Sequence, residues 1–571
     1  MPFLKILTDI LISIIMKERH FCQEKRRFLM NKHAIYHRPE SNFCFAIDEK
    51  TVVLRIRFAK GDKIESLSVL YNSKYDIGKT QYRAKMPFIC CDGLHDYYSV
   101  TLKLSDPRLA YVFEFSSDGK KYYFCEAGVK ESYDFSLAYY DSFQYAYINK
   151  NDIIQNVKWL NNAVFYQIFI DRFDKASEKD ESYINASWGD LPTPKSFFGG
   201  DLDGICKHLD YIQELGVTAL YLNPIFKSPS NHKYDIIDYY EIDEMFGGKE
   251  AFKRLVKACH ERGIKIMLDA VFNHVSEKFY PFGQVMALGK KSEYFDWFVI
   301  DGDKISPDRD NYDCFAACKY MPKLNTNNPE VQSYLIDVAK HYITEYGIDG
   351  WRLDVADEVS HDFWRQMRRK IKAGNPDAVL IGENWHNSES FLQGDQFDSI
   401  MNYGVTKAFL DFFAREIIDE KGFAEALNAQ LMRYTDTTNN MMFNLLDCHD
   451  THRFYSEVGC DARKLMRALL TLVFLPGSIN LYYGTEILTE GGYDPDSRRT
   501  FDFEKLNNSE IKGIKGEIAY ILKLKNQPAI AHGSIRIWSG DGYVTIERKC
   551  EEQTLTLKIC SKNYTIEGEM L

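Results

Sequence analysis

The sequence predicts a multidomain protein with a central (β/α)8 TIM barrel, an N-terminal β-sandwich, a domain inserted after the third barrel strand and a short C-terminal β domain. Three patterns carry this prediction. Residues 36–135 alternate short strands with turn clusters, residues 163–526 alternate apolar strands with helical stretches, and residues 527–571 return to strands. Frequent turns between short strands are typical of a sandwich, whereas regular strand–helix alternation is typical of a parallel barrel.

Residues 1–35 form an N-terminal extension that begins with "MPFLKILTDILISIIMKERH". Its apolar run is short for a membrane span, Asp9 interrupts it, and the charged segment that follows has no small-residue cleavage site. We therefore expect an amphipathic lead-in, or a start codon assigned too early with Met30 as the true start. We expect a cytoplasmic protein with no membrane partner.

The β-sandwich is expected over residues 36–135. Strand-like segments such as "TVVLRIRFA" and "YYSVTLKL" are separated by turn clusters such as "KGDK" and "SSDGKK". Alternating apolar and polar residues with regularly spaced turns are typical of strands in a two-sheet domain.

The barrel is expected to begin after a linker, within residues 136–274, and to continue over residues 326–526. Eight apolar segments are its expected strands: 163–170, 216–226, 263–274, 347–356, 378–385, 397–403, 442–450 and 478–486. Residues 275–325, after the third of these, are too many for an ordinary loop and predict an inserted domain. Residues 527–571 are the expected C-terminal β domain.

Composition narrows the classes of function. The net charge of -11 comes from 71 basic and 82 acidic residues without a long block of either sign, so no nucleic-acid partner is expected. The 13 cysteines follow no ordered spacing, which favours free thiols in a reducing compartment. Cys314 and Cys318 have no second ligand pair nearby, so no zinc site is expected.

Polar side chains follow several of the expected strands at the point where each ends. Active sites of TIM barrels lie at the carboxyl ends of the strands. Arg352 and Asp354 taken alone fit an ordinary ion pair, because positions i and i+2 of a strand share a face. The convergence on one rim favours a catalytic site instead. The residues concerned are Asp269, Asn273 and His274 after the third strand, Arg352 and Asp354 at the fourth, Glu383 at the fifth, and His449 and Asp450 at the seventh.

The segments "DAVFNH" (269–274), "GWRLDVADE" (350–358), "GENW" (382–385) and "LLDCHDT" (445–451) resemble the four signature regions of the α-amylase family of glycoside hydrolases. The segments "MPKLN", "FFGGDLDGI", "HKYDIIDYYEID" and "GDQFDSIMNY" further resemble the neopullulanase, cyclomaltodextrinase and maltogenic amylase subgroup. Members of that subgroup carry an N-terminal β-sandwich, as expected here.

The resemblance implies a retaining mechanism, which uses two carboxyl groups roughly 5–5.5 Å apart. By motif match Asp354 is the nucleophile and Glu383 is the acid/base. Asp450 matches the third carboxylate, which grips sugar hydroxyls. Arg352 is expected to keep Asp354 ionised, since a nearby cation lowers a carboxyl pKa.

The same motif matches imply a binding site for one glucose unit. His274 and His449 are expected to bond its hydroxyls, and Tyr234 to stack beneath it. Arg352, Trp385 and Glu358 complete the expected substrate contacts. Asp269 and Asn273 are expected to support these residues from behind.

The sequence departs from the subgroup at three places. Asp447 and Cys448 stand where Gly and Ser are usual, and Asp357 stands where Asn is common. The subgroup's calcium loop is replaced by "DRFDKASEKDES", in which the usual spacing is lost. Asp174, Asp180 and Asp201 could still gather oxygen ligands. No cofactor is therefore expected to be required, no metal ligand is assigned, and calcium stays a candidate.

Three functions remain open at this stage. The first is hydrolysis of α-1,4 and also α-1,6 glucosidic bonds in cyclodextrins, pullulan, starch fragments or maltooligosaccharides. The second is transglycosylation of the same α-glucans. The third is non-catalytic carbohydrate binding, which the presence of all three carboxylates disfavours. The expected partners are an oligosaccharide substrate and a second copy of the chain in a homodimer.

Overall fold

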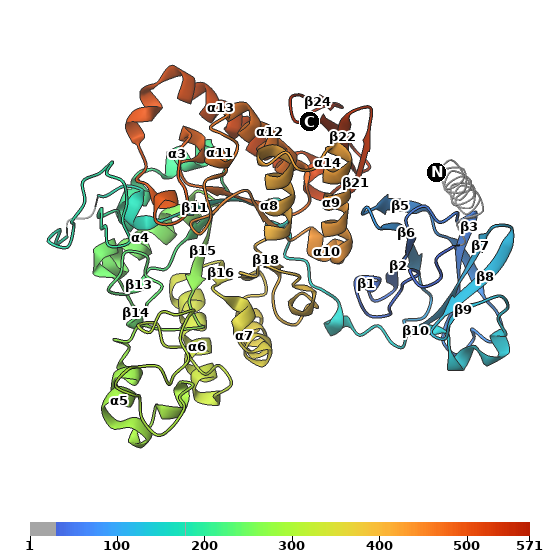
Figure 1. Ribbon diagram of the computed structural model, residues 1–571, viewed down its shortest axis with the longest axis horizontal. Coiled ribbons are helices and arrows are strands. Elements are labelled where there is room, and N and C mark those ends of the chain that lie inside the picture. The colour runs from blue at the N-terminus through green and yellow to red at the C-terminus, as the bar shows by residue number, and fades with distance from the viewer. Residues whose placement is uncertain (1–29, 177–178) are drawn as a thin grey trace, which may run out of the picture. The chain divides into compact units, whose positions relative to one another are not determined.

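The computed structural model describes residues 30–176 and 179–571. Two compact units make up the chain: the first ends at Lys150, and the second runs Asn151–Leu571 (Figure 1). Each unit is described by itself. The expectation for residues 1–29 lies outside the described residues. Among the helices of the described part of the chain, none is both long and apolar enough to cross a membrane.

The first unit is a β-sandwich, as expected. One sheet has the order β1-β2-β6-β5, and the other has the order β4-β3-β7-β8-β9 with β10 paired to β7. Phe58 of one sheet and Phe115 of the other meet at 5.2 Å between ring centroids, inside the sandwich. The strands are β1 (Cys44–Asp48), β2 (Thr51–Ala59), β3 (Ser66–Asn72), β4 (Tyr82–Lys85), β5 (Phe88–Cys91), β6 (His95–Lys103), β7 (Leu109–Ser117), β8 (Lys120–Cys125), β9 (Gly128–Lys130) and β10 (Phe143–Tyr145).

The expected boundary of the sandwich at residue 135 is too early. A 3-10 turn at Phe135–Tyr140 packs on β7 through Ala138 and Ala110, and β10 then adds to the same sheet. Residues 136–150 therefore belong to the first unit and not to a linker of the barrel. The strand β10 was missed because three residues are too few to display an alternating pattern.

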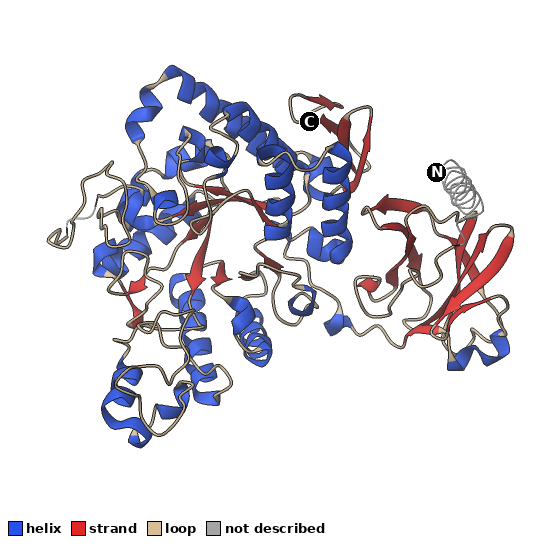
Figure 2. Cartoon of the chain, viewed as in Figure 1, coloured by secondary structure: helices blue, strands red, loops and turns tan. Residues whose placement is uncertain are grey.

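The second unit contains the barrel. Its sheet has eight parallel strands in the order β18-β17-β16-β15-β12-β11-β20-β19, and every strand falls within an expected segment. Figure 2 shows strands in red and the surrounding helices in blue. A single parallel bridge between Met401 and Phe443 joins the two ends of this sheet. The strands are β11 (Val164–Ile168), β12 (Ala219–Leu222), β15 (Lys265–Ala270), β16 (Gly350–Leu353), β17 (Val379–Gly382), β18 (Ser399–Ile400), β19 (Phe443–Leu445) and β20 (Ser478–Tyr482).

Helices cover the outside of the barrel, and the amphipathic ones pack on it with an apolar face. In α7, Phe363, Trp364, Met367 and Ile371 are buried and recur at helical spacing. The helices are α2 (Leu202–Lys207), α3 (Leu209–Glu214), α4 (Gly248–Glu261), α6 (Pro329–His341), α7 (His361–Gly374), α8 (Tyr403–Phe409), α9 (Glu420–Arg433), α10 (Asp436–Asn439), α11 (Phe454–Glu457), α12 (Ala462–Phe474) and α13 (Ser509–Lys523). A short hairpin, β13 (Phe226–Lys227) and β14 (Asp238–Ile242), follows β12.

The excursion after the third barrel strand is present between β15 and α6. It contains α5 (Tyr280–Leu288), short 3-10 turns and isolated bridges such as Phe298 to Leu324. Phe282, Trp297 and Tyr312 belong to the same apolar core as the barrel. The insertion is therefore a lobe built onto the barrel, and its apolar side chains do not form a separate core.

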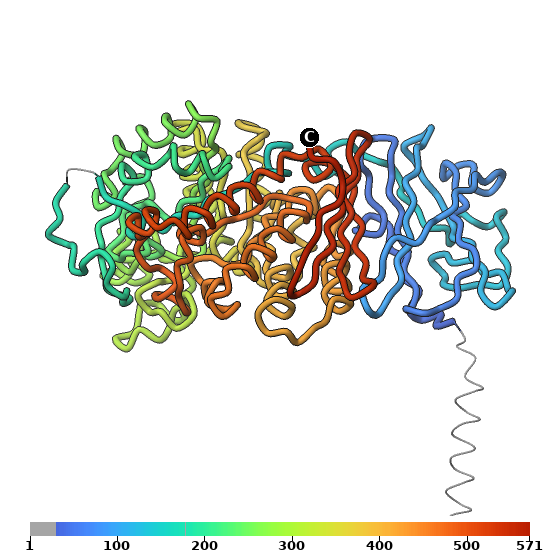
Figure 3. The backbone as a smooth tube through the Cα atoms, turned by 90° about the horizontal axis from the view of Figure 1, so that it is seen from above, coloured from blue at the N-terminus to red at the C-terminus, as the bar shows by residue number. Residues whose placement is uncertain are grey.

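The C-terminal β domain consists of α14 (Pro528–His532) and an antiparallel sheet in the order β21-β22-β23-β24. The sheet lies against α9, where the Asn428 amide donates to the Ile537 carbonyl at 3.1 Å (Figures 1 and 3). Its strands are β21 (Ser534–Gly540), β22 (Tyr543–Lys549), β23 (Thr554–Ile559) and β24 (Tyr564–Glu567).

Candidate active site

A cavity of about 380 Å³ lies at the carboxyl ends of the barrel strands. Asp354 comes directly after β16, Glu383 after β17 and Asp450 in the loop after β19, so parallel neighbours deliver all three carboxyls to one place. Six of the expected site residues line this cavity: Tyr234, His274, Asp354, Glu383, Trp385 and Asp450.

Arg352 links the carboxyls and is completely buried. Its Nη1 lies 2.8 Å from Asp269 Oδ1 and 2.7 Å from Asp354 Oδ1, and its Nη2 lies 2.8 Å from Glu383 Oε2. Asp269 stands opposite Arg352 in the β15–β16 register, which brings the two side chains together inside the barrel. A buried guanidinium with three carboxyl neighbours explains why charges interrupt an otherwise apolar strand.

The two carboxyl oxygens of Asp354 differ in their hydrogen bonding. Arg352 donates to Oδ1, whereas Oδ2 is buried and accepts no hydrogen bond from any residue that the structure describes. Burial raises the pKa of Asp354 well above its usual range, and Arg352 opposes that rise. Arg352 acts in the direction expected from the sequence, because its guanidinium stabilises the charged form of Asp354 that a nucleophile requires.

Glu383 accepts hydrogen bonds on both oxygens. The Val355 backbone N–H donates to Oε2 at 2.9 Å, and Trp385 Nε1 donates to Oε1 at 3.2 Å. Burial raises the pKa of Glu383, with Arg352 opposing. A carboxyl whose pKa is raised by burial suits a general acid.

Val355 has a strained backbone between these two carboxyls. Its φ of 44° and ψ of 47° lie in the left-handed region, which a β-branched residue rarely adopts. Such a conformation costs about 1–3 kcal/mol and persists where the surroundings enforce it. Here it directs the N–H of the residue after Asp354 towards the Glu383 carboxyl.

Asp450 sits in a charged corner of the cavity. Arg498 Nη2 lies 3.1 Å from Asp450 Oδ1 and 3.3 Å from Asp494 Oδ2, and His449 Nε2 lies 3.1 Å from Asp450 Oδ2. The Asp450 side chain is 30% exposed, so it can reach a ligand. Arg498 and Asp494 were not predicted, because they lie in the irregular segment after the last barrel strand.

His449 belongs to a buried chain of hydrogen bonds and is not itself among the side chains that line the cavity. Gln167 Nε2 donates to His449 Nδ1 at 2.8 Å, which leaves Nε2 as the protonated nitrogen. That nitrogen lies 2.6 Å from the Tyr234 hydroxyl, and the hydroxyl donates to Asp269 Oδ2 at 2.8 Å. Burial lowers the pKa of His449 well below its usual range, so the ring is neutral. His449 therefore contacts Tyr234 and Asp450, whereas it was expected from the sequence to face the cavity directly.

Tyr234 lines the cavity with its ring while its hydroxyl is fully used. The hydroxyl donates to Asp269 and accepts from the Asn223 side chain at 2.9 Å and from His449. These three bonds fix the ring, as a stacking surface requires.

His274 offers a free donor to the cavity. Its Nδ1 lies 3.3 Å from the Asn273 amide nitrogen, and its buried Nε2 has no hydrogen-bond partner among the described residues. Burial lowers the pKa of His274 to about 3, and the ring stacks on Phe315 at 4.7 Å between centroids. A neutral imidazole with an unused N–H is suited to a sugar hydroxyl.

Glu358 does not line the cavity, contrary to its expected substrate contact. Its side chain is 51% exposed and pairs with Lys323 Nζ at 3.0 Å. Lys323 also contacts the Asn273 side chain, so Glu358, Lys323 and Asn273 form one row at the rim. Glu358 lies in a 3-10 turn, Ala356–Glu358, that carries it away from Asp354.

Further residues complete the cavity: Trp385 was expected as a substrate contact, and eight others were missed by sequence reasoning. Trp385 is 53% exposed and stacks on Tyr403 at 3.7 Å, which makes a flat aromatic surface at the entrance. Irregular loops carry no periodic signal, so position in the fold alone identifies these residues. Those not predicted are His232, Phe315, Cys318, Tyr320, Met321, Val355, Asp494 and Arg498.

Asp447 and Asp357, the two acids that depart from the subgroup motifs, have partners other than Arg352. Asp447 accepts the Phe454 backbone N–H at 2.7 Å and does not line the cavity. Asp357 lies 3.0 Å from His386 Nε2. Neither side chain takes part in the arrangement around Arg352.

The three acids considered for calcium are not gathered. Asp174 contacts Lys207 and His208, Asp180 accepts bonds from Ser182, and Asp201 pairs with Lys179. These carboxylates do not fit a common metal. All twelve cysteines of the described residues are free thiols.

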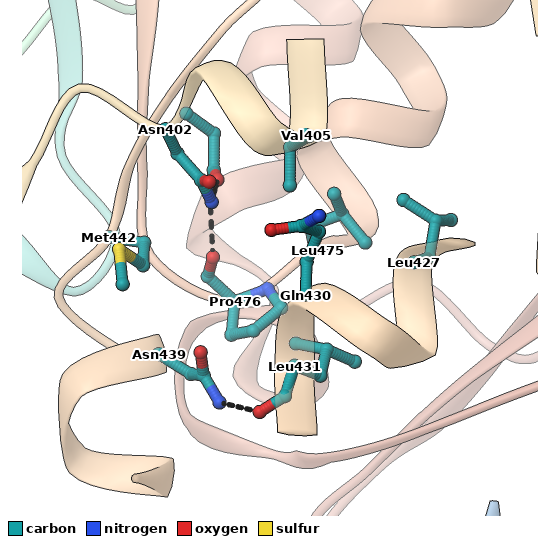
Figure 4. A pocket seen from close by; sticks show the side chains of 10 residues that line it. Asn402, Val405, Leu427, Gln430, Leu431, Asn439, Met442, Leu475 and Pro476 are labelled. Carbon is teal, nitrogen blue, oxygen red and sulfur yellow. Dashed lines mark hydrogen bonds between the residues drawn. The ribbon is translucent and has the colours of Figure 1, made fainter. Parts of the chain in front are cut away.

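Figure 4 shows a second, smaller pocket in the same unit, lined by apolar and amide side chains. The Asn402 amide donates to Asn444, and Asn444 donates to the Pro476 carbonyl at 2.8 Å. Its lining contains no ionisable side chain. The Asn444 amide thus satisfies a backbone carbonyl shortly before β20, and the Asn402 amide satisfies the Asn444 side chain.

The fold and the cavity define a barrel enzyme that works with paired carboxyls, as glycoside hydrolases do. Residues 167–517 match the α-amylase catalytic domain, and residues 30–149 match the α-amylase N-terminal Ig-like domain. The chain belongs to the α-amylase family.

Named relatives fall within the subgroup that the motifs resemble. A cyclomaltodextrinase of Geobacillus thermopakistaniensis is 43% identical over 524 residues, which cover 90% of this chain and 88% of the relative. An intracellular maltogenic amylase of Bacillus subtilis is 39% identical over 541 residues, covering 92% and 90%. The solved structure of a cyclomaltodextrinase has a TM-score of 0.87 at 38% identity, covering 92% of this chain and 91% of that chain.

Proposed function

We propose that this protein is a retaining glycoside hydrolase that cleaves α-1,4 glucosidic bonds, and also α-1,6 bonds, in cyclodextrins and other short α-glucans. One observation carries the proposal: Asp354 and Glu383 line the cavity together and both contact the Arg352 guanidinium, while the buried Asp354 Oδ2 has no hydrogen-bond partner among the described residues. The relatives named for cyclomaltodextrin and maltose chemistry support the substrate class.

In the first step Asp354 Oδ2 attacks the anomeric carbon. As that bond forms, the glycosidic bond breaks, and Glu383 gives its proton to the leaving oxygen. In the second step the Glu383 carboxylate takes a proton from water. The water oxygen bonds to the anomeric carbon, Asp354 is released, and two inversions give net retention.

The remaining side chains position the sugar. The partly exposed Asp450 can reach sugar hydroxyls while Arg498 and His449 contact its two oxygens, and His274 Nε2 is a donor without a partner among the described residues. The Tyr234 ring, fixed by its three hydrogen bonds, provides the surface for the sugar face. Arg352 keeps the two reacting carboxyls side by side.

The proposal is tested with Asp354→Asn and Glu383→Gln. Each variant removes a chemical role and little volume, so turnover of cyclodextrin, pullulan, starch and maltotriose should fall by roughly 10⁴-fold or more. The measurement is kcat/KM with the melting temperature recorded beside it. Asp377→Asn, an exposed acid, is the matched control. Activity within tenfold of the unchanged protein in either variant refutes the assignment.

The same assay separates hydrolysis from transglycosylation. At high maltotriose concentration a hydrolase gives glucose and maltose, whereas a transglycosidase gives products longer than the substrate. We expect hydrolysis to dominate.

We further propose a cytoplasmic homodimer. The free thiols fit a reducing compartment, and one relative carries the word intracellular in its name. On the first unit Tyr75, Tyr139 and Tyr140 are large exposed aromatics, which are common at protein interfaces.

A further inference from the structure

A buried lysine lies in the loop that follows the first barrel strand. Lys179 Nζ lies 2.8 Å from the Gly199 carbonyl oxygen, 2.9 Å from Asp201 Oδ2 and 2.7 Å from the Met245 carbonyl oxygen. Its side chain is only 6% exposed. An ammonium group has three N–H donors, and here three oxygens receive them.

Asp201 and the Met245 carbonyl also accept hydrogen bonds from other residues. Asp201 caps α2 by accepting the Gly204 N–H at 2.7 Å, and it also accepts the Ala176 N–H at 3.1 Å. The Tyr183 hydroxyl donates to the Met245 carbonyl at 3.1 Å.

The backbone conformation at Gly199, which orients the third oxygen, is also restricted. Its φ is +86°, a left-handed backbone conformation that glycine adopts without strain and residues with a Cβ rarely adopt. The three oxygens around Lys179 Nζ, here called the oxygen cradle, are therefore positioned by the local fold and not by the flexible lysine side chain.

One carboxylate oxygen and two carbonyl oxygens that converge on one point are the ligands that hard cations prefer. In this chain the point is filled by the ammonium group, while Asp174 and Asp180 are engaged with other partners. We infer that Lys179 is a tethered cation that takes the place of a divalent metal and ties the loop after β11 to α2 and to the segment after β14.

A tethered cation differs from a bound metal in one measurable respect. A metal stabilises the native state in proportion to its free concentration, by mass action. A lysine is always present at its site, so stability should not depend on free calcium. Burial lowers the pKa of Lys179, and its hydrogen bond to Asp201 opposes that shift.

The first test uses the unchanged protein. Its melting temperature is recorded in excess chelator and in millimolar calcium chloride. We expect the same value in both. A clear fall in chelator would show that a resident metal contributes, and would overturn the inference without any variant having to fold.

The second test compares two lysines of one loop. Lys175 pairs with Glu181 at the surface, and its side chain is 44% exposed. Lys179→Met should lower the melting temperature by several degrees, whereas Lys175→Met should leave it nearly unchanged, because surface ion pairs contribute little. Equal effects of the two substitutions would overturn the inference.

The third test uses Lys179→Asn, which removes the ammonium group and adds an amide oxygen beside the cradle. We expect this variant to gain melting temperature on addition of calcium chloride, in contrast to the unchanged protein. The absence of any gain would show that the cradle accepts only lysine, and the replacement of a metal would then be rejected.

Discussion

Individual residues at this site make contacts with several catalytic groups at once. Arg352 contacts Asp269, Asp354 and Glu383, so one side chain both satisfies the buried carboxyls and sets their spacing. Val355 accepts a strained backbone and places its N–H on Glu383. Burying charges in this way is unfavourable unless they are paired, which explains why the site is tightly connected.

His274 gives a prediction about acid stability. Its pKa is lowered to about 3 in the folded state, against an ordinary value of 6.5. Between these values the unfolded chain binds the proton and the folded chain does not, so stability falls as the pH falls below about 6.5. From pH 6 to pH 5 the unchanged protein should lose roughly 1 kcal/mol more unfolding free energy than His274→Asn.

Denaturant titrations at the two pH values measure this difference. His33, which is exposed, provides the matched His33→Asn control and should leave the pH slope unaltered. If His274→Asn follows the same slope as the unchanged protein, His274 is not held neutral by burial.

At the level of elements, helix caps set where the barrel helices begin. The Asn328 side chain accepts the Glu330 N–H at 2.8 Å, and Pro329 occupies the first position of α6. Asn328→Ala should cost about 1 kcal/mol of stability and leave kcat/KM unchanged. Thermal unfolding checks the first statement and cyclodextrin hydrolysis the second.

Asn327→Ala is the control for that cap, because the exposed Asn327 side chain lies just before it. Equal destabilisation by both substitutions would mean that the cap bond contributes nothing.

The elements also show how far sequence reasoning reaches. All eight barrel strands and the strand-end carboxyls were predicted, because buried parallel strands are short apolar runs and the motifs mark their ends. The strand β10 and the insertion's shared core were not predicted, since neither has a periodic pattern. Glu358 and His449 sit close to the motif core in sequence, but a tight turn and a covering tyrosine keep them out of the cavity.

For the whole molecule, the proposed homodimer gives a prediction about assembly. The protein should sediment as a dimer at micromolar concentration, and removal of the first unit through Lys150 should yield a monomer. We expect the truncated protein to prefer starch over cyclodextrin more than the full chain does, because in the proposed dimer the first unit of one copy would narrow the cavity entrance of the other and favour small rings. A monomeric full chain, or an unchanged ratio of specificity constants, would contradict the proposal.

The closure of the barrel has a consequence for its motions. One bridge, Met401 to Phe443, joins β18 to β19, and β18 itself is two residues long. A closed sheet joined at one place by a single bridge is expected to open first at that junction, here called the seam. Backbone amides of β18 and β19 along the seam should therefore exchange with solvent sooner than those of β15 and β16. Glu383 follows a strand on one side of the seam and Asp450 follows a strand on the other. Small excursions at the seam would therefore change the distance between the acid and the third carboxylate, and would let the cavity adapt to sugar rings of different width.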